Sequence, residues 1–339
     1  MARKPRIEYP GALYHVMSRG YRGRRIFKDE PDYELFRVAM REVCERCGWR
    51  LHAFVEMPNH FHWLLETPEA NLVAGMKWFL GTYSQRFNAR HGQRGHVFQG
   101  RYKAIPISSD SGDYFERISS YIHLNPARAK LLGQETKGLE DYQWSSFIGY
   151  MATKKNRPRW LAVDRVFGNL GLKDDRRGRL AYKEYMADRV SQLQTTAGRK
   201  RAKEEEKAIK YSWYLGDEAF KECLVKMLGN TVAGNERESY GGDAIRQHDE
   251  HQAEGLVLRG LKLLGLDDAD LVALAKGNTQ KCALAWLVHS QTMASHRWIT
   301  ERLCMGVPSN MTRYVQSIAC PTTPEEKRMK NKLKRQIPK

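Results

Sequence analysis

The first 150 residues alternate between two kinds of hydrophobic pattern. Short segments with a two-residue period predict strands, because successive side chains of a strand point to opposite faces of its sheet. Longer segments with apolar residues every three or four positions predict helices. The expected strands are Tyr14 to Arg19, Trp49 to Glu56, His60 to Glu66 and Arg101 to Ser108, and the expected helices are Asp32 to Cys47 and a long helix with Asn71 as its N-cap.

The order of these elements is βαββαβ, which predicts an α+β fold with a ferredoxin-like domain over residues 1–150. In this fold both helices cover one face of the sheet, so we expect the other face to be open. Pro58 and Asn59 are typical turn residues, and they predict a hairpin between the second and third strands.

Beyond residue 150 the pattern is helical. We expect a linker and helical segment over 151–210, because residues 153–159 are polar and basic and the run from Arg199 to Lys210 is highly charged. Residues 211–320 predict an all-α C-terminal region, and residues 321–339 predict a basic tail, of which Lys327 to Lys339 is expected to stay disordered until it meets an anion.

Three short segments within the C-terminal region predict a helix-turn-helix. They are Lys281 to Ser290, Trp298 to Cys304 and Pro308 to Ser317. Asn310, Thr312 and Arg313 would then lie on the recognition helix. Such a module would tether the chain to duplex DNA.

Charge and cysteine content narrow the choice of partner and compartment. The chain has 57 Lys and Arg against 39 Asp and Glu, a net charge of +18 that suits a polyanion. Its six cysteines lack the spacing of a disulfide scaffold, and Cys44 and Cys47 read as packed residues of a helix because no second half of a zinc site accompanies them. No apolar run has the ~20 residues of a membrane span, so we expect a cytoplasmic protein without a membrane partner.

His60 and His62 flank Phe61 in the third expected strand. The alternation of a strand places both imidazoles on one face, with Phe61 and Trp63 on the other. Two half-exposed edge histidines would produce the same pattern as a metal site. The strand therefore makes these residues candidate ligands without deciding between the two interpretations.

A second candidate segment is Tyr121-Ile-His-Leu-Asn125-Pro126. Tyr121 and Asn125 are four residues apart on an expected helix from Gly112 to about Leu124, so they share one face of it. Pro126 disfavours helical geometry at the preceding residue, which predicts a frayed or kinked helix end at Asn125. A tyrosine that packs by its ring is the alternative to a nucleophile here.

Three motifs in this order resemble the REP-associated tyrosine transposases, which are single-tyrosine HUH transposases of the IS200-like superfamily. They are His60-Phe61-His62, Gly95-His-Val-Phe-Gln-Gly-Arg-Tyr-Lys103 and Tyr121-Ile-His-Leu-Asn-Pro-Ala-Arg128. The resemblance covers about the first 150 residues and implies a metal-dependent endonuclease and strand transferase. This enzyme would act on single-stranded, palindromic or hairpin DNA through a 5′-phosphotyrosine intermediate.

The resemblance also implies the roles of individual residues. Tyr121 would be the catalytic nucleophile, and His60, His62 and Asn125 would bind a divalent metal ion, Mg or Mn. Imidazole suits manganese better than magnesium. Independently of the resemblance, Glu56 shares the hairpin with both histidines, and we expect it to orient one of them through the second ring nitrogen of that histidine, as metal sites usually require.

One other tyrosine and two other histidines lie near these motifs in the sequence or in the expected sheet. Tyr114, two helical turns before Tyr121, is the second choice for the nucleophile. His15 could lie near the metal, although a partner within the sheet is its simpler interpretation. His123 could contact DNA, although its spacing places it off the Tyr121 face.

Basic residues interspersed with aromatic ones are typical of single-strand binding, since cations contact phosphates and rings stack on bases. The residues expected to bind DNA on this ground are Arg19, Arg22, Arg24 and Arg25, which surround Tyr21, and the family resemblance implies that Arg101 and Lys103 contact the same DNA. The chain could act as a monomer or a homodimer, with Tyr121 donated within one chain or to a partner. The alternative function is a catalytically silent DNA-binding regulator derived from a transposase.

Overall fold

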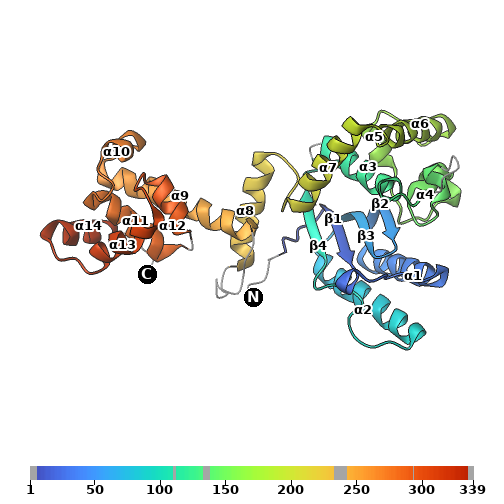
Figure 1. The fold of residues 1–339 in the computed structure, drawn as a ribbon, viewed down its shortest axis with the longest axis horizontal. Coiled ribbons are helices and arrows are strands. Elements are labelled where there is room, and N and C mark those ends of the chain that lie inside the picture. Colours follow the sequence, from blue (N-terminus) through green and yellow to red (C-terminus); the bar gives the residue numbers. More distant parts are fainter. Residues whose placement is uncertain (1–5, 110–111, 133–137, 233–242, 293, 335–339) are drawn as a thin grey trace. The chain divides into compact units, whose positions relative to one another are not determined.

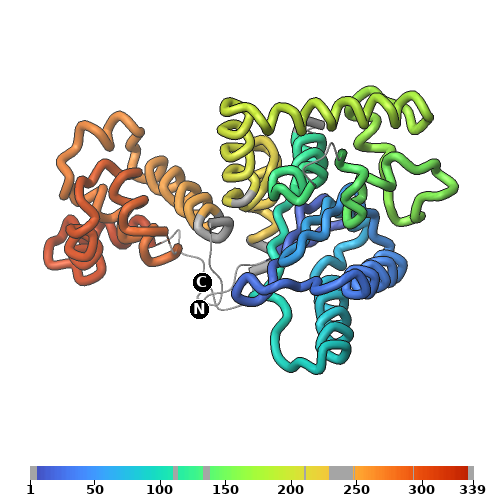
Figure 2. Tube along the Cα trace, turned by 45° about the vertical axis from the view of Figure 1, so that its right-hand side comes forward, coloured from blue at the N-terminus to red at the C-terminus, as the bar shows by residue number. Residues whose placement is uncertain are grey.

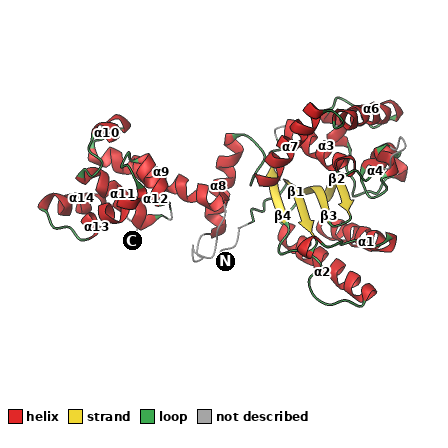
Figure 3. Cartoon of the chain, viewed as in Figure 1, coloured by secondary structure: helices red, strands yellow, loops and turns green. Residues whose placement is uncertain are grey.

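The computed structural model describes residues 6–109, 112–132, 138–232, 243–292 and 294–334. The chain divides into two compact units, one of residues 6–221 and one that contains residues 222–339. The strands lie in the first unit, and the described part of the second unit is helical (Figure 3). The prediction of an α+β domain followed by an all-α region is therefore confirmed.

A four-stranded antiparallel sheet with the strand order β2-β3-β1-β4 forms the centre of the first unit (Figure 1). Together with helices α1 and α2 its strands follow the βαββαβ order of the predicted ferredoxin-like fold. Met57 pairs with His60 across the two-residue turn, as expected for the hairpin. The bounds are β1 Ala12–Arg19, α1 Glu30–Cys47, β2 Arg50–Met57, β3 His60–Thr67, α2 Leu72–His91 and β4 Lys103–Ile107.

Helices α1 and α2 cover one face of this sheet. The Phe36 ring of α1 lies 5.1 Å from that of Phe61, and the Phe79 ring of α2 lies 4.6 Å from that of Trp63. All four aromatic side chains are fully buried. The alternation predicted along β3 is thus correct, and its odd-numbered residues anchor the strand in this core.

The other face of the sheet is covered as well, so the prediction of an open face is wrong. Helix α3 (Gly112–Arg128) returns across it after β4, and its Phe115 ring lies 4.9 Å from the His52 ring of β2. Phe115, Ile118 and Ile122 form a buried stripe on α3. An amphipathic helix needs an apolar partner for such a stripe, and the sheet supplies it.

Further helices continue the layer on the α3 side of the sheet (Figure 2). They are α4 Phe147–Met151, α5 Asp164–Asn169, α6 Arg176–Gln192 and α7 Thr196–Tyr211, with 3-10 turns at Tyr21–Gly23, Leu139–Asp141 and Lys154–Asn156. Within the expected linker, Arg157 pairs with Asp174 at 2.7 Å, and only 5% of its side chain is exposed. Residues 151–210 therefore pack on the core of the first unit, although the domain boundaries themselves remain predictions.

Both edges of the sheet are paired with irregular chain. At the β2 edge the Glu56 amide donates to the Trp144 carbonyl at 2.9 Å. At the β4 edge the Leu215 amide donates to the Pro106 carbonyl at 2.9 Å, and the Ser108 amide donates to the Leu215 carbonyl at 2.7 Å. Pairing of this kind blocks association through exposed strand edges.

The second unit packs around helix α11, whose residues 281–288 are all buried. The three segments of the predicted helix-turn-helix form α11, α12 and α13, which leaves the DNA-binding module itself a prediction. Helix α8 (Glu218–Val232) contains the boundary between the two units. The helices that follow are α9 Asp243–Leu264, α10 Asp268–Ala273, α11 Thr279–Gln291, α12 His296–Arg302, α13 Met311–Ala319 and α14 Pro324–Lys334, with a 3-10 turn at Pro308–Asn310.

The expectation of a disordered basic tail is wrong for most of its length. Helix α14 occupies residues 324–334, and its Met329 and Leu333 side chains are buried in the core around α11. Two apolar residues four positions apart give this basic segment an apolar face to bury. Residues 335–339 lie outside the described part of the chain. Among the described residues no helix is both long enough and apolar enough to span a bilayer.

Two glycines of α2 allow a direct test of this packing. A Cβ atom at Gly75 would lie 2.2 Å from Cζ2 of the buried Trp49, whereas a Cβ atom at the exposed Gly81 would have no atom within 4 Å. We expect Gly75→Ala to lower the free energy of unfolding by ~1–3 kcal/mol through overpacking. Gly81→Ala should raise it by up to ~1 kcal/mol through helix propensity. Urea denaturation measures both, and equal effects of the two substitutions would contradict the packing described.

Candidate active site

Three histidines occupy the face of the sheet that α3 covers. His60 and His62 alternate with Phe61 on β3, and their ring centroids lie 5.1 Å apart. His15 of the neighbouring strand β1 stacks on His62, with 5.1 Å between centroids and 25° between ring planes. His15 and His62 are buried, while His60 is partly exposed. The structure therefore brings together the two predicted ligand histidines and adds a third one.

Hydrogen bonds fix the orientation of these rings. His60 Nδ1 lies 2.7 Å from Asn59 Oδ1, which can only accept, so Nδ1 carries the proton and Nε2 is the unprotonated nitrogen. His62 Nδ1 lies 2.9 Å from His15 Nε2, which also directs the His62 Nε2 atom away from the pair. Burial lowers the pKa of His15 to about 3, so this ring is neutral. Each candidate ligand thus uses Nδ1 within the protein, and Nε2 is the nitrogen that would suit a metal ion.

Helix α3 places Tyr121 directly over the histidines. Its ring meets His62 edge-on, at 5.6 Å between centroids and 88°, and meets His15 at 5.8 Å and 75°. The Tyr121 side chain is buried, with 3% of the residue exposed. The predicted nucleophile and one predicted ligand, His62, therefore meet within one chain.

The predicted break of the helix at Asn125 does not occur, because α3 continues through Pro126 to Arg128. Pro126 has no N–H for the Ile122 carbonyl. The Asn125 side chain compensates, since its Nδ2 atom lies 3.5 Å from that carbonyl and donates to the Tyr121 carbonyl at 2.9 Å. The amide nitrogen is thereby engaged with the helix, which leaves Oδ1 as the atom of Asn125 that suits a metal ion.

Two charged groups near Tyr121 modify its acidity. Burial, reinforced by the Glu206 carboxylate of α7 and opposed by the Arg128 guanidinium, raises the pKa of Tyr121 to about 12. Arg128 Cζ lies 5.0 Å from the centre of the Tyr121 ring, and its Nη2 atom donates to Glu206 Oε2 at 2.7 Å. Sequence reasoning assigned no role to Arg128, although its position seven residues after Tyr121 places it two turns along the same helical face.

The donor set fits a divalent metal ion. Two imidazole Nε2 atoms and one amide oxygen are neutral ligands of the kinds that manganese and later transition metals accept. Neutral ligands also leave the charge of the ion available to a phosphate group.

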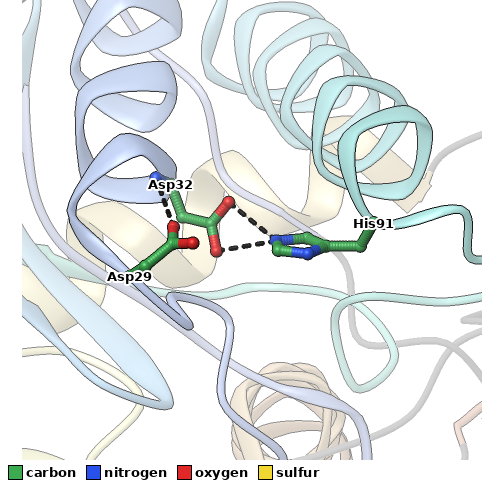
Figure 4. Close-up of side chains that lie close together, drawn as sticks. All are labelled: Asp29, Asp32 and His91. Atoms are coloured by element: carbon green, nitrogen blue, oxygen red, sulfur yellow. Dashed lines mark hydrogen bonds and ion pairs between the residues drawn. The ribbon is translucent and has the colours of Figure 1, made fainter.

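A second group of metal-binding residue types occurs at the ends of α1 and α2. Asp29, Asp32 and His91 place one ligand atom each within 4.8 Å of one another (Figure 4). Arg90, however, donates through Nη1 to both carboxylates at 2.7 Å. Asp29 also accepts from the Asp32 amide as the N-cap of α1. A guanidinium already balances these charges, so the cluster is a structural ion-pair network.

The prediction that Glu56 orients a ligand histidine is wrong. Glu56 pairs with Phe61 across the hairpin, so its side chain lies on the α1 side of the sheet, opposite the histidine face. There Arg37 Nε donates to Glu56 Oε2 at 3.2 Å. The two-residue turn sets this register, and a shift of one residue would have reversed the outcome. His15, instead of Glu56, contacts the second ring nitrogen of a candidate ligand, His62.

The predicted DNA-binding residues divide into two groups. Arg19 of β1 pairs with His60 of β3, so both side chains lie on the same face of the sheet. Lys103 of β4 pairs with Met17 of β1, which in turn pairs with His62, so Lys103 lies on this face as well. The others lie in loops with exposed side chains, namely Arg22, Arg24, Arg25 and Arg101. DNA contact by any of these residues stays a prediction.

The two rivals named for the site have other surroundings. His123 is fully buried, with Nε2 2.7 Å from Ser146 Oγ and Nδ1 2.8 Å from Tyr182 Oη. It therefore holds the segment after α3 in place, off the Tyr121 face as predicted. Tyr114 is half-buried and lines a cavity of about 270 Å³ with Arg117 and Tyr214.

Comparison with known proteins identifies the N-terminal segment. Residues 9–125 match the family model described as "Transposase IS200 like". A solved structure described as a REP-associated tyrosine transposase bound to a REP hairpin is similar at 19% identity, with a TM-score of 0.37, and the match covers 48% of this chain and 92% of that chain. No curated protein matches the chain.

Glu56 generates a prediction about stability. Burial raises the pKa of Glu56 to about 8, against the opposing effect of Arg37. Because an unfolded glutamate titrates near 4.5, the folded chain holds an extra proton between these values, and the contribution of Glu56 to stability is lost as pH rises through them. We expect Glu56→Gln to flatten the decline of the unfolding free energy between pH 5 and 8. The control is Glu42→Gln, which alters a half-exposed glutamate of helix α1 that also pairs with an arginine; a wild-type profile unchanged by Glu56→Gln would contradict this.

Proposed function

Residues 9–125 belong to the IS200-like transposase family, and from this premise we propose that the chain is a metal-dependent endonuclease and strand transferase of single-stranded DNA. It acts at palindromic or hairpin DNA, and Tyr121 forms a 5′-phosphotyrosine intermediate. The observation that carries this proposal is the position of the Tyr121 ring, edge-on to both His62 and His15.

The proposed reaction exchanges one phosphodiester for another. The Tyr121 Oη atom forms a bond to the scissile phosphorus while the bond from phosphorus to the 3′ oxygen breaks. The phenol gives its proton to solvent, and the leaving oxygen takes one up to become a 3′-hydroxyl. Attack by a 3′-hydroxyl on the phosphotyrosine rejoins the strand, so the cycle needs no ATP.

Residues of this chain would assist the reaction in two ways. His60, His62 and Asn125 would hold a divalent ion, which supplies charge to stabilise the phosphoryl oxygens. Arg128, beside the Tyr121 ring, favours the phenolate over the phenol. Phenolate formation needs such help, because burial makes Tyr121 a weaker acid than free tyrosine.

The burial of the site imposes a condition on substrate entry. Tyr121 and His62 are each 3% exposed, whereas His60 is partly exposed. A DNA phosphate would therefore approach from the His60 end, where Arg19 lies opposite on β1, and α3 would move outward as it enters. The same burial favours a second candidate, a DNA-binding regulator that has the fold without turnover.

The second unit would contribute binding to duplex DNA. On α13 the Thr312, Arg313 and Gln316 side chains are exposed, while Met311, Tyr314 and Ile318 face the core. The turn before this helix contains Gly306 with φ of +86°. Exposed polar residues on the last helix of such a triplet are the arrangement by which helix-turn-helix modules read the major groove.

A covalent trap separates the enzyme from the silent regulator. Full-length protein is incubated with a labelled single-stranded hairpin and Mn²⁺, and denaturing gels detect a protein-DNA adduct. We expect an adduct that disappears in Tyr121→Phe and falls at least tenfold in His60→Ala and His62→Ala. Tyr114→Phe on the same helix is the control and should retain the adduct. Absence of any wild-type adduct would favour the regulator, and an adduct that survives in Tyr121→Phe would contradict the assignment of the nucleophile.

Duplex binding has its own test. A duplex that the full-length protein enriches from a random-sequence library is titrated by fluorescence anisotropy. Because a base contact contributes ~1–3 kcal/mol, we expect Arg313→Ala to weaken binding about tenfold or more. Arg259→Ala removes the same charge from an exposed site on α9 and should change binding little. Equal losses in both variants would indicate general electrostatic attraction instead of recognition by α13.

A further inference from the structure

We infer that His15 is a positioning residue of this site: its Nε2 atom accepts the Nδ1–H of His62 and thereby selects the tautomer in which His62 offers its Nε2 lone pair to a divalent cation. This inference rests on the proposed function, because it concerns the same cation. It gives a role to a side chain that neither packing nor the proposed chemistry of Tyr121 requires.

The contact between the two rings is specific. His15 Nε2 and His62 Nδ1 are 2.9 Å apart, and the rings are nearly parallel at 25°. His15 is fully buried, and β1 is a central strand in which His15 pairs with Leu64 on one side and Ile105 on the other. The backbone of β1 is therefore held on both sides, which gives His15 a fixed position beside its partner.

The chemistry of a bond between two imidazoles leaves two arrangements. A hydrogen bond between two imidazoles needs a hydrogen on one of the two facing nitrogens and a lone pair on the other. If His15 donated, the proton of His62 would sit on Nε2, and His62 would have no lone pair there for a cation. If His62 donates, its Nε2 atom is unprotonated and carries the lone pair. Metal-binding histidines commonly donate their second ring N–H to a protein acceptor, which fixes the tautomer and orients the ring.

The remaining nitrogen of His15 argues against a role in packing alone. His15 Nδ1 is buried and has no hydrogen-bond partner in the described structure. A buried polar atom without a partner is costly, and a leucine at this position would avoid it. The other ring nitrogen is the one His15 uses, and it contacts a candidate ligand.

Two substitutions of His15 with side chains of similar size test whether it acts as a hydrogen-bond acceptor. His15→Gln retains a side-chain acceptor, whereas His15→Leu retains only the volume. Mn²⁺ affinity of the full-length protein is measured from the free-ion signal in electron paramagnetic resonance. Since loss of such a partner costs about 10–100-fold in metal affinity, we expect that loss in His15→Leu and recovery of most of it in His15→Gln. Glu56→Gln, on the opposite face of the sheet, is the control and should bind as the wild type does.

The outcomes distinguish this inference from the proposed function. If the wild type binds Mn²⁺, His62→Ala abolishes binding and a folded His15→Leu binds normally, the role of His15 is refuted while the proposed function stands. If the wild type neither binds Mn²⁺ nor forms an adduct, the proposed function is refuted, and the role of His15 is refuted with it. Melting temperatures report whether each variant folds.

A measurement on the unmodified protein covers the case in which His15→Leu does not fold. Long-range ¹H–¹⁵N spectra of histidine-labelled wild type, with Zn²⁺ as a diamagnetic probe, report which ring nitrogen of His62 is protonated. We expect the proton on Nδ1. A proton on Nε2 in the presence of Zn²⁺ would overturn the inference.

Discussion

The packing of α3 against the histidine face of the sheet is the contact on which the site depends. It brings the Tyr121 ring within 6 Å of the His62 and His15 rings, measured between centroids. It also explains why the site is buried, because the helix that carries Tyr121 covers His15 and His62. A single interface thus assembles the chemical groups and restricts access to them, so an active enzyme must loosen this interface when DNA enters.

Much of the first unit was predictable from local patterns. The alternation along β3 placed His60 and His62 opposite Phe61, and the two-residue turn predicted the hairpin. Relations between distant strands were not predictable in this way. Glu56 is four residues from His60 yet faces the other side of the sheet, because the hairpin register decides the face. His15 is 47 residues from His62, and only the pairing of β1 with β3 brings them together.

The errors beyond the strands have a common cause. Charged composition suggested a linker at 153–159 and a disordered tail at 327–339, but a few residues in each segment make specific contacts. Arg157 pairs with Asp174 under almost complete burial, and Met329 and Leu333 complete the core around α11. Average polarity does not reveal such contacts, because a helix needs only one apolar face to pack. The open face of the sheet was expected for a similar reason. Helix α3 comes after the βαββαβ elements, and their order does not indicate where a later helix packs.

The central claim is that Tyr121 itself becomes linked to DNA, and peptide mapping tests it most directly. The adduct formed in Mn²⁺ is digested with nuclease and trypsin, and the peptides are sequenced by mass spectrometry. Cleavage after Arg117 and Arg128 isolates Tyr121 in a peptide without another tyrosine, while Tyr114 falls in the preceding peptide. The account predicts a residual nucleotide on Tyr121. A nucleotide on Tyr114 or on any other residue would contradict it.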